Sequence, residues 1–100
     1  MLPAQFSFAA ELWEHDGQGA WHFLSLPESE ADEIEESYGA KAGGFGSVRV
    51  AVTIGSTSWS TSIFPDRKRG TYVLPVKKAV RTAERLTAGT TVEVALEAIQ

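Results

Sequence analysis

The fold is decided by the stretch SVRVAVTIGSTSWSTSIF, residues 47–64. Its first half has valine or isoleucine at every second position of residues 48–54, which is the period of a β-strand with one buried face. Residues 58–64 alternate in the same way. Between the two halves, Gly55 and Ser56 suit a two-residue hairpin turn with glycine at its first central position. The stretch therefore predicts an antiparallel hairpin.

Outward from this hairpin, alternation with a period of two predicts four more strands. They are residues 6–13, 21–26, 71–74 and 91–99. A glycine-containing turn at residues 16–19 joins the first two, which predicts a second hairpin. Residues 41–46 form a glycine-rich connector ahead of the central hairpin.

Two segments begin with proline, which suits the first helical turn. Their apolar residues recur at the spacing of a helix. The first covers residues 27–38 and ends before Gly39, a natural stop. The second begins at Pro75 and ends before the loop that Gly89 closes. The apolar stripes are Ala31, Ile34 and Tyr38 in the first helix, and Val76, Ala79, Val80, Ala83 and Leu86 in the second.

Length and composition set the scale of the fold. The chain has 100 residues, of which 43% are hydrophobic and 22% charged, and this is the size and make-up of one globular domain. Strands and helices in the order β-β-α-β-β-β-α-β most simply close into a small barrel, or a strongly bent sheet, whose open ends the helices cover. The prediction is a mainly β fold with two short α-helices, a six-stranded antiparallel barrel that forms a single domain over residues 1–100.

The composition also excludes several kinds of chemistry. The chain has no cysteine, so disulfides, thiolate metal sites and cysteine nucleophiles are ruled out. Its first residues lack the basic segment and apolar run of a signal peptide. No stretch approaches the ~20 apolar residues that span a bilayer. We therefore expect a cytoplasmic protein that has no membrane partner. We also expect a protein of bacterial type.

Charge is distributed unevenly, although the net value of −4 predicts no general affinity for nucleic acid. Six of the 13 acidic residues lie in residues 28–36, within the first predicted helix. Seven of the nine basic residues lie in residues 67–85, in and before the second.

The basic residues of the second predicted helix form a stripe. Lys77, Arg81 and Arg85 are four residues apart, and Lys78 flanks them. Residues 67–69 are also basic and extend the patch if their loop folds beside the helix. One interpretation is an anion site for phosphate, a nucleotide or a nucleic-acid backbone. The alternative is a solvated surface, or pairing with the acidic helix.

A second candidate site combines aromatic and hydroxyl side chains on and beside the strand at residues 58–64. Hydroxyls beside aromatic rings suit a small-molecule pocket with a few polar anchors. The alternative is ordinary packing, with Trp59 in the core and the serines facing water. The predicted ligand-binding set is Trp59, Thr61, Ser62, Tyr72, Arg49, Lys77 and Arg81.

The residues predict no catalytic group, no metal site and no cofactor. His15 and His22 are the only histidines, and no metal-binding motif surrounds either of them. The glycines of residues 43–46 lead into a strand and lack the lysine of a phosphate-binding loop.

Two segments carry a resemblance to a known family: WSTSIFP at residues 59–65 and GTYVLPVKKAVR at residues 70–81. They resemble the DUF1905 family, and the similarity extends over nearly the whole chain. It includes the opening Phe/Leu/Trp strand, Gly-x-Trp at residues 19–21, Leu26 with Pro27, Tyr38 with Gly39, and Gly-x-x-Val at residues 89–92.

This resemblance implies a small β-barrel of about this length. The family's domain also occurs attached to a helical domain associated with bacteriocin protection, and we expect no such partner domain here. Because the family name denotes unknown function, the resemblance implies no catalytic or ligand-binding residues.

Three functions remain open. The first is a non-catalytic binding domain that holds a small anionic ligand or a peptide near the barrel mouth. The second is a regulatory domain that binds nucleic acid or an acidic protein through the basic helix, which the net negative charge disfavours. The third is an enzyme of unknown type. Exposed strand edges leave both a monomer and a homodimer open.

Overall fold

The structure is a computed structural model that describes residues 5–15, 21–39 and 46–99. The predicted turn at residues 16–19 and most of the predicted connector lie outside the described residues. The described elements follow the predicted order β-β-α-β-β-β-α-β. They are β1 (Gln5–Glu14), β2 (His22–Ser25), α1 (Glu28–Tyr38), β3 (Val48–Ile54), β4 (Thr57–Asp66), β5 (Thr71–Pro75), α2 (Lys78–Glu84) and β6 (Thr91–Ala98).

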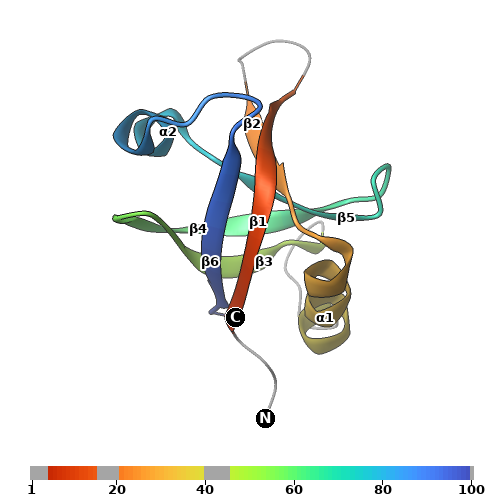
Figure 1. Cartoon of the computed structure of the whole chain (residues 1–100). Coiled ribbons are helices and arrows are strands. Elements are labelled where there is room, and N and C mark those ends of the chain that lie inside the picture. The colour runs from red at the N-terminus through yellow and green to blue at the C-terminus, as the bar shows by residue number, and fades with distance from the viewer. Residues whose placement is uncertain (1–4, 16–20, 40–45, 100) are drawn as a thin grey trace.

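The strands form a closed antiparallel barrel in the order β1-β2-β5-β4-β3-β6 (Figure 1). The last strand, β6, completes the closure because it pairs with both β1 and β3. The predicted mainly β fold is therefore confirmed. Closure also gives every described strand two neighbours, although β4 pairs with β3 over residues 57–63 and with β5 only over residues 64–66.

The barrel interior is filled by every second residue of the strands. In β3, Val48, Val50 and Val52 are at most 1% exposed, whereas Arg49 between them is exposed. Full burial of one such side chain contributes ~1.5–3 kcal/mol to folding. The same alternation buries Phe6 and Leu12 of β1 and Val92, Val94 and Leu96 of β6.

The turn between β3 and β4 is the one that the sequence predicts. Ile54 pairs with Thr57, so Gly55 and Ser56 form a two-residue loop. Gly55 has a φ of 59°, in the left-handed region where a Cβ is disfavoured.

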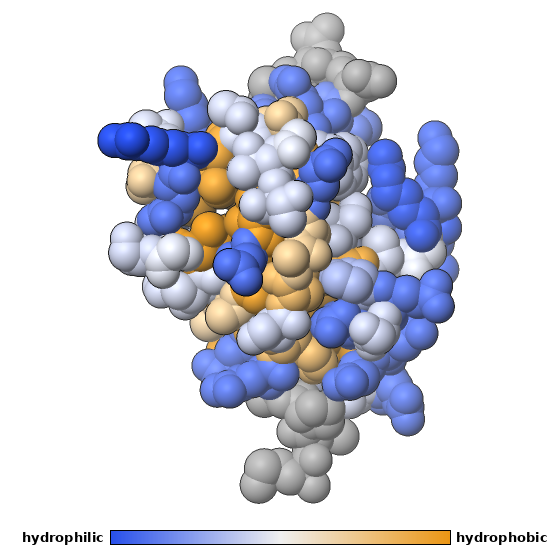
Figure 2. Space-filling model, in the orientation of Figure 1, coloured by the Kyte–Doolittle hydropathy of each residue, from blue (hydrophilic) through white to orange (hydrophobic). Residues whose placement is uncertain are grey.

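On the face of the barrel crossed by β1 and β6, hydrophobic residues lie across much of the middle and hydrophilic residues gather at the margins (Figure 2). Its outward positions include Ala9 and Ala95, which are small, and the acidic Glu93 and Glu97. Neither strand contains lysine or arginine. These two strands therefore present no cationic side chain to an anion.

The first helix, α1, agrees with its prediction. Pro27 precedes it as the N-cap, and Ala31, Ile34 and Tyr38 are its buried residues. The helix lies beside one end of the barrel, and α2 lies at the opposite side of the molecule (Figure 1).

The prediction for the second helix is wrong at its start and at two positions of its apolar face. Pro75 is the last residue of β5, opposite Phe23, and Val76 N donates to His22 O, so the chain remains extended there. The helix begins only at Lys78. It is so short that Val80 is its one buried residue, while the predicted inward residues Ala79 and Ala83 are exposed. With 11 and 7 residues, neither helix of the described chain is long and apolar enough to cross a membrane.

Candidate functional site

A pocket of about 380 Å³, the α2 pocket, lies between β4, the end of β5 and α2. The β4 wall consists of Trp59, Ser60 and Thr61. The β3–β4 register sets the direction of these side chains: Trp59 is opposite Val52 and Thr61 is opposite Val50, both of which are buried. Because residues opposite one another share a face, Trp59 and Thr61 point inward and are half-buried, whereas Ser60 faces outward.

The wall opposite β4 is cationic. Lys77 and Lys78 are exposed, and Arg81 is half-buried. Nε of Arg81 donates a 3.1 Å hydrogen bond to the carbonyl oxygen of Val76. This contact fixes the base of the guanidinium group and leaves its terminal Nη atoms as donors.

These three cations have no carboxylate within ion-pair distance among the residues that the structure describes. The acid closest to them in sequence, Glu84, accepts hydrogen bonds from Thr57 and Ser56 instead. Like charges on neighbouring helical positions cost a few tenths of a kcal/mol per pair. Fold stability alone therefore does not explain this cluster.

The rim of the pocket is formed by Trp21 and His22, where the chain enters β2. Pairing of Phe23 with Pro75 holds the start of β2 beside the end of β5. Trp21 is 58% exposed, the largest value among the exposed large hydrophobic residues of the described chain.

Sequence comparison identifies the family of this barrel. A family model described as a domain of unknown function, DUF1905, matches residues 8–96. The chain belongs to the DUF1905 family. No match to a curated protein was found.

In this DUF1905 domain, four of the seven predicted binding residues line the pocket: Trp59, Thr61, Lys77 and Arg81. The structure does not bring the other three to it. Arg49 and Ser62 are Cα partners on β3 and β4, and alternation turns both away from Trp59 and Thr61. Tyr72 lies toward the opposite end of the barrel, next to α1.

Six of the ten lining residues are missing from the predicted set, among them Trp21 and Lys78. Lys78 had a signal, since it flanks the basic stripe. No local pattern indicated that Trp21 would line the pocket, because its place depends on the non-local pairing of Phe23 with Pro75.

The predicted basic stripe is only partly formed. Arg85 follows the last residue of α2 and takes a left-handed conformation with a φ of 56°, so it leaves the helical register of Lys77 and Arg81. The loop after β4 lies at the end of β5 far from α2 (Figure 1). Its basic residues, 67–69, line a different pocket and do not extend the patch.

The acidic and basic helices of the DUF1905 domain are also separate. They lie on opposite sides of the molecule (Figure 1), and no ion pair joins α1 to α2 among the described residues. The interpretation of the basic stripe as a partner of the acidic helix is therefore not supported.

The α1 end of the domain is organised around Tyr72. Its hydroxyl donates a 2.7 Å hydrogen bond to Oε2 of Glu35 on α1. Burial raises the pKa of Tyr72, and the hydrogen bond and charge of Glu35 raise it further. A pocket of about 410 Å³ here is lined by Asp32, Glu35, Asp66 and one cation, Arg67. Its excess of carboxylates makes it unsuitable for an anion.

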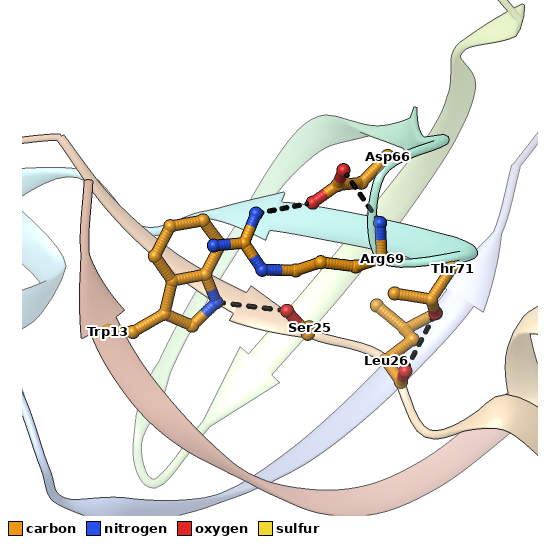
Figure 3. Close-up of polar contacts among 6 residues, drawn as sticks. All are labelled: Trp13, Ser25, Leu26, Asp66, Arg69 and Thr71. Carbon is orange, nitrogen blue, oxygen red and sulfur yellow. Dashed lines mark hydrogen bonds and ion pairs between the residues drawn. The ribbon is translucent and has the colours of Figure 1, made fainter. Parts of the chain in front are cut away.

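A cation and an aromatic ring also meet where the β4–β5 loop lies beside β1 and β2 (Figure 3). The guanidinium carbon of Arg69 lies 4.0 Å from the centroid of the Trp13 ring. Nη1 of the same Arg69 forms a 2.9 Å ion pair with Asp66, and the Trp13 indole donates to Ser25. Arg69 is therefore already paired within the fold, unlike the lysines of the α2 pocket.

No cluster of metal-ligating side chains occurs in the parts of the DUF1905 domain that are described. The two histidines are on paired stretches of β1 and β2, but their side chains have different neighbours. His15 packs edge-on against Trp13 and Phe23, whereas His22 is at the rim of the α2 pocket.

Proposed function

We propose that this domain is a non-catalytic binding module and that the pocket beside α2 holds a small anionic ligand. The observation that carries the proposal is the cluster of Lys77, Lys78 and Arg81 around one pocket with no carboxylate partner in the described chain. Unpaired cations on a concave surface concentrate field lines and attract an anion.

The size and lining of the pocket support a small molecule in preference to a peptide. Its volume of about 380 Å³ is near the lower end of the ~300–1,000 Å³ range of small-molecule sites. Trp59, Pro75 and Val76 supply apolar contact, and the hydroxyl of Thr61 supplies a polar anchor. A cytoplasmic location, expected from the sequence, is consistent with binding a charged metabolite.

The pocket residues have distinct parts in this proposal. Arg81, anchored through Nε, presents two Nη donors that can bind an anion in bidentate fashion. Lys77 and Lys78 add mobile charges at the mouth. Trp59 excludes water from one side, which strengthens the electrostatic attraction.

Titration calorimetry with sodium pyrophosphate at low ionic strength tests the proposal. The double variant K77A/K78A should weaken binding about tenfold or more, since charge-assisted hydrogen bonds contribute ~1.5–3 kcal/mol each. The matched control is R67A/K68A, which removes the same charge from the β4–β5 loop and should change the affinity less than about twofold. Absence of saturable binding, or equal loss in both variants, would refute the proposal.

The second candidate is binding of nucleic acid or an acidic protein through α2. It is favoured by the exposure of Lys77, Lys78 and Arg85 and disfavoured by the net charge of −4. Binding of a single-stranded oligonucleotide at low salt that K77A/K78A abolishes, without pyrophosphate binding, would select this candidate instead.

A further inference from the structure

The rim residue Trp21 has a feature that the anion proposal does not use. Its ring stacks on Phe23 with a centroid distance of 6.1 Å and an interplanar angle of 11°. Phe23 in turn packs against Trp13 at 5.1 Å. Trp21 is thus supported on one face by a row of aromatic rings.

Despite this support, Trp21 is 58% exposed. A ring that is stacked on one face and still mostly exposed offers its other face to solvent. Large apolar surface held in a fixed orientation at the edge of a pocket is typical of a binding site. The stack on Phe23 orients the ring before any ligand arrives, which reduces the entropy lost on binding.

The cations of the same pocket complete the arrangement. Trp21 lines the pocket together with Lys77, Lys78 and Arg81. A ligand that stacks on Trp21 therefore has its anionic group beside lysine and arginine donors, with the hydroxyl of Thr61 on the β4 wall.

We infer that the ligand is an anion that carries a planar aromatic ring, of the class of a nucleoside monophosphate. The ring stacks on Trp21 and the phosphate binds Lys77, Lys78 and Arg81. Base–aromatic stacking tolerates any base because every base has a π-face, so we expect little discrimination between purines and pyrimidines. This inference rests on the proposed anion site and assigns the chemical class of its ligand.

The test compares adenosine 5′-monophosphate with ribose 5-phosphate, which has the same phosphate and sugar without the base. We expect the wild-type domain to bind the nucleotide at least tenfold more tightly. The substitution Trp21→Ala should remove this difference and leave the affinity for ribose 5-phosphate within twofold. Phe64→Ala is the matched control, because Phe64 is an aromatic residue with 39% exposure that does not line this pocket; it should preserve the tenfold difference.

The possible outcomes distinguish failure of the aromatic-ligand inference from failure of the proposed anion site. Equal affinity of the wild-type domain for the two phosphates overturns the assignment of an aromatic ligand and leaves the anion site in place. A tenfold difference that survives Trp21→Ala overturns the role of Trp21. If neither compound nor pyrophosphate binds, the anion site itself is wrong and the inference fails with it.

Discussion

Thr57 Oγ1 donates a 2.6 Å hydrogen bond to Oε2 of Glu84, which joins the start of β4 to the end of α2. Ser56 Oγ lies 3.4 Å from the same oxygen. Trp59 and Thr61 follow Thr57 on β4, and Arg81 precedes Glu84 by one helical turn. The Thr57–Glu84 pair therefore sets the distance between the apolar and cationic walls of the pocket.

The substitution Thr57→Val removes the hydroxyl that donates to Glu84 but keeps the shape of the side chain and the local charge. We expect a loss of about 1–2 kcal/mol in the free energy of unfolding, because a partly buried carboxylate loses its hydrogen bond. Pyrophosphate binding should also weaken, since α2 is less firmly held. Urea denaturation and calorimetry measure the two effects. Thr53→Val is the control: its exposed hydroxyl bonds only Ser58, and an equal loss there would contradict the role of Thr57.

Gly55 is constrained in two ways, and a pair of variants separates them. Its φ is 59°, and a Cβ at this position would overlap the Glu84 carboxylate. Gly70 has a similar φ of 70°, but a Cβ there would meet no atom within 4 Å beyond its chain neighbours. Gly70→Ala should thus cost only the left-handed backbone penalty of about 1–2 kcal/mol. Gly55→Ala should cost more and weaken anion binding; equal costs in urea denaturation would show that the Glu84 contact is unimportant.

Replacement of Arg85 by glycine should stabilise the fold. Its φ of 56° places a side chain in the left-handed region, where the chain ends α2 with an N–H bonded to Arg81 O and Thr82 O. Glycine takes this conformation without the Cβ penalty. We expect Arg85→Gly to raise the free energy of unfolding by up to about 1 kcal/mol, whereas Arg85→Ala should not raise it. Destabilisation by the glycine variant would mean that the arginine side chain has a structural role.

The raised pKa of Tyr72 makes stability depend on alkaline pH. In the unfolded chain a tyrosine loses its proton near pH 10, whereas burial and Glu35 keep Tyr72 protonated in the fold. Above about pH 10 the unfolded state binds fewer protons, so the free energy of unfolding falls as the pH rises toward the folded pKa.

Replacement of Tyr72 by phenylalanine removes this term. The substitution should cost about 1 kcal/mol at pH 8 through loss of the hydrogen bond to Glu35. The difference between the two proteins should shrink between about pH 10 and pH 11. Urea denaturation across this range is the measurement, and a difference that stays constant would show that Tyr72 ionises alike in both states.

Local sequence patterns predicted the barrel well, because burial of alternate residues is a local property. The valines of β3, the Gly55 turn and the order of elements all followed from a period of two and from turn chemistry. The second helix was harder. Pro75 marks a helix start in isolation, but here pairing of β5 with β2 extends the strand through Pro75 and delays the helix to Lys78.

The candidate site was predicted only in part for a related reason. Trp59, Thr61, Lys77 and Arg81 meet because β4 and α2 are joined at Glu84, and the sequence placed them on compatible faces. Ser62 and Arg49 were predicted to line the site but do not, because neighbouring strand positions face opposite sides of the sheet. Trp21 lines the pocket because the strand order β1-β2-β5 brings the start of β2 beside α2. No local sequence pattern encodes this strand order.

Chemical-shift mapping by ¹H–¹⁵N NMR during titration with pyrophosphate tests the anion pocket most directly. We predict saturable shifts at the backbone amides of residues 59–61 and 76–81, reduced in K77A/K78A. Shifts confined to residues 67–70, or spread evenly over the basic residues of the surface, would contradict the assignment of this pocket.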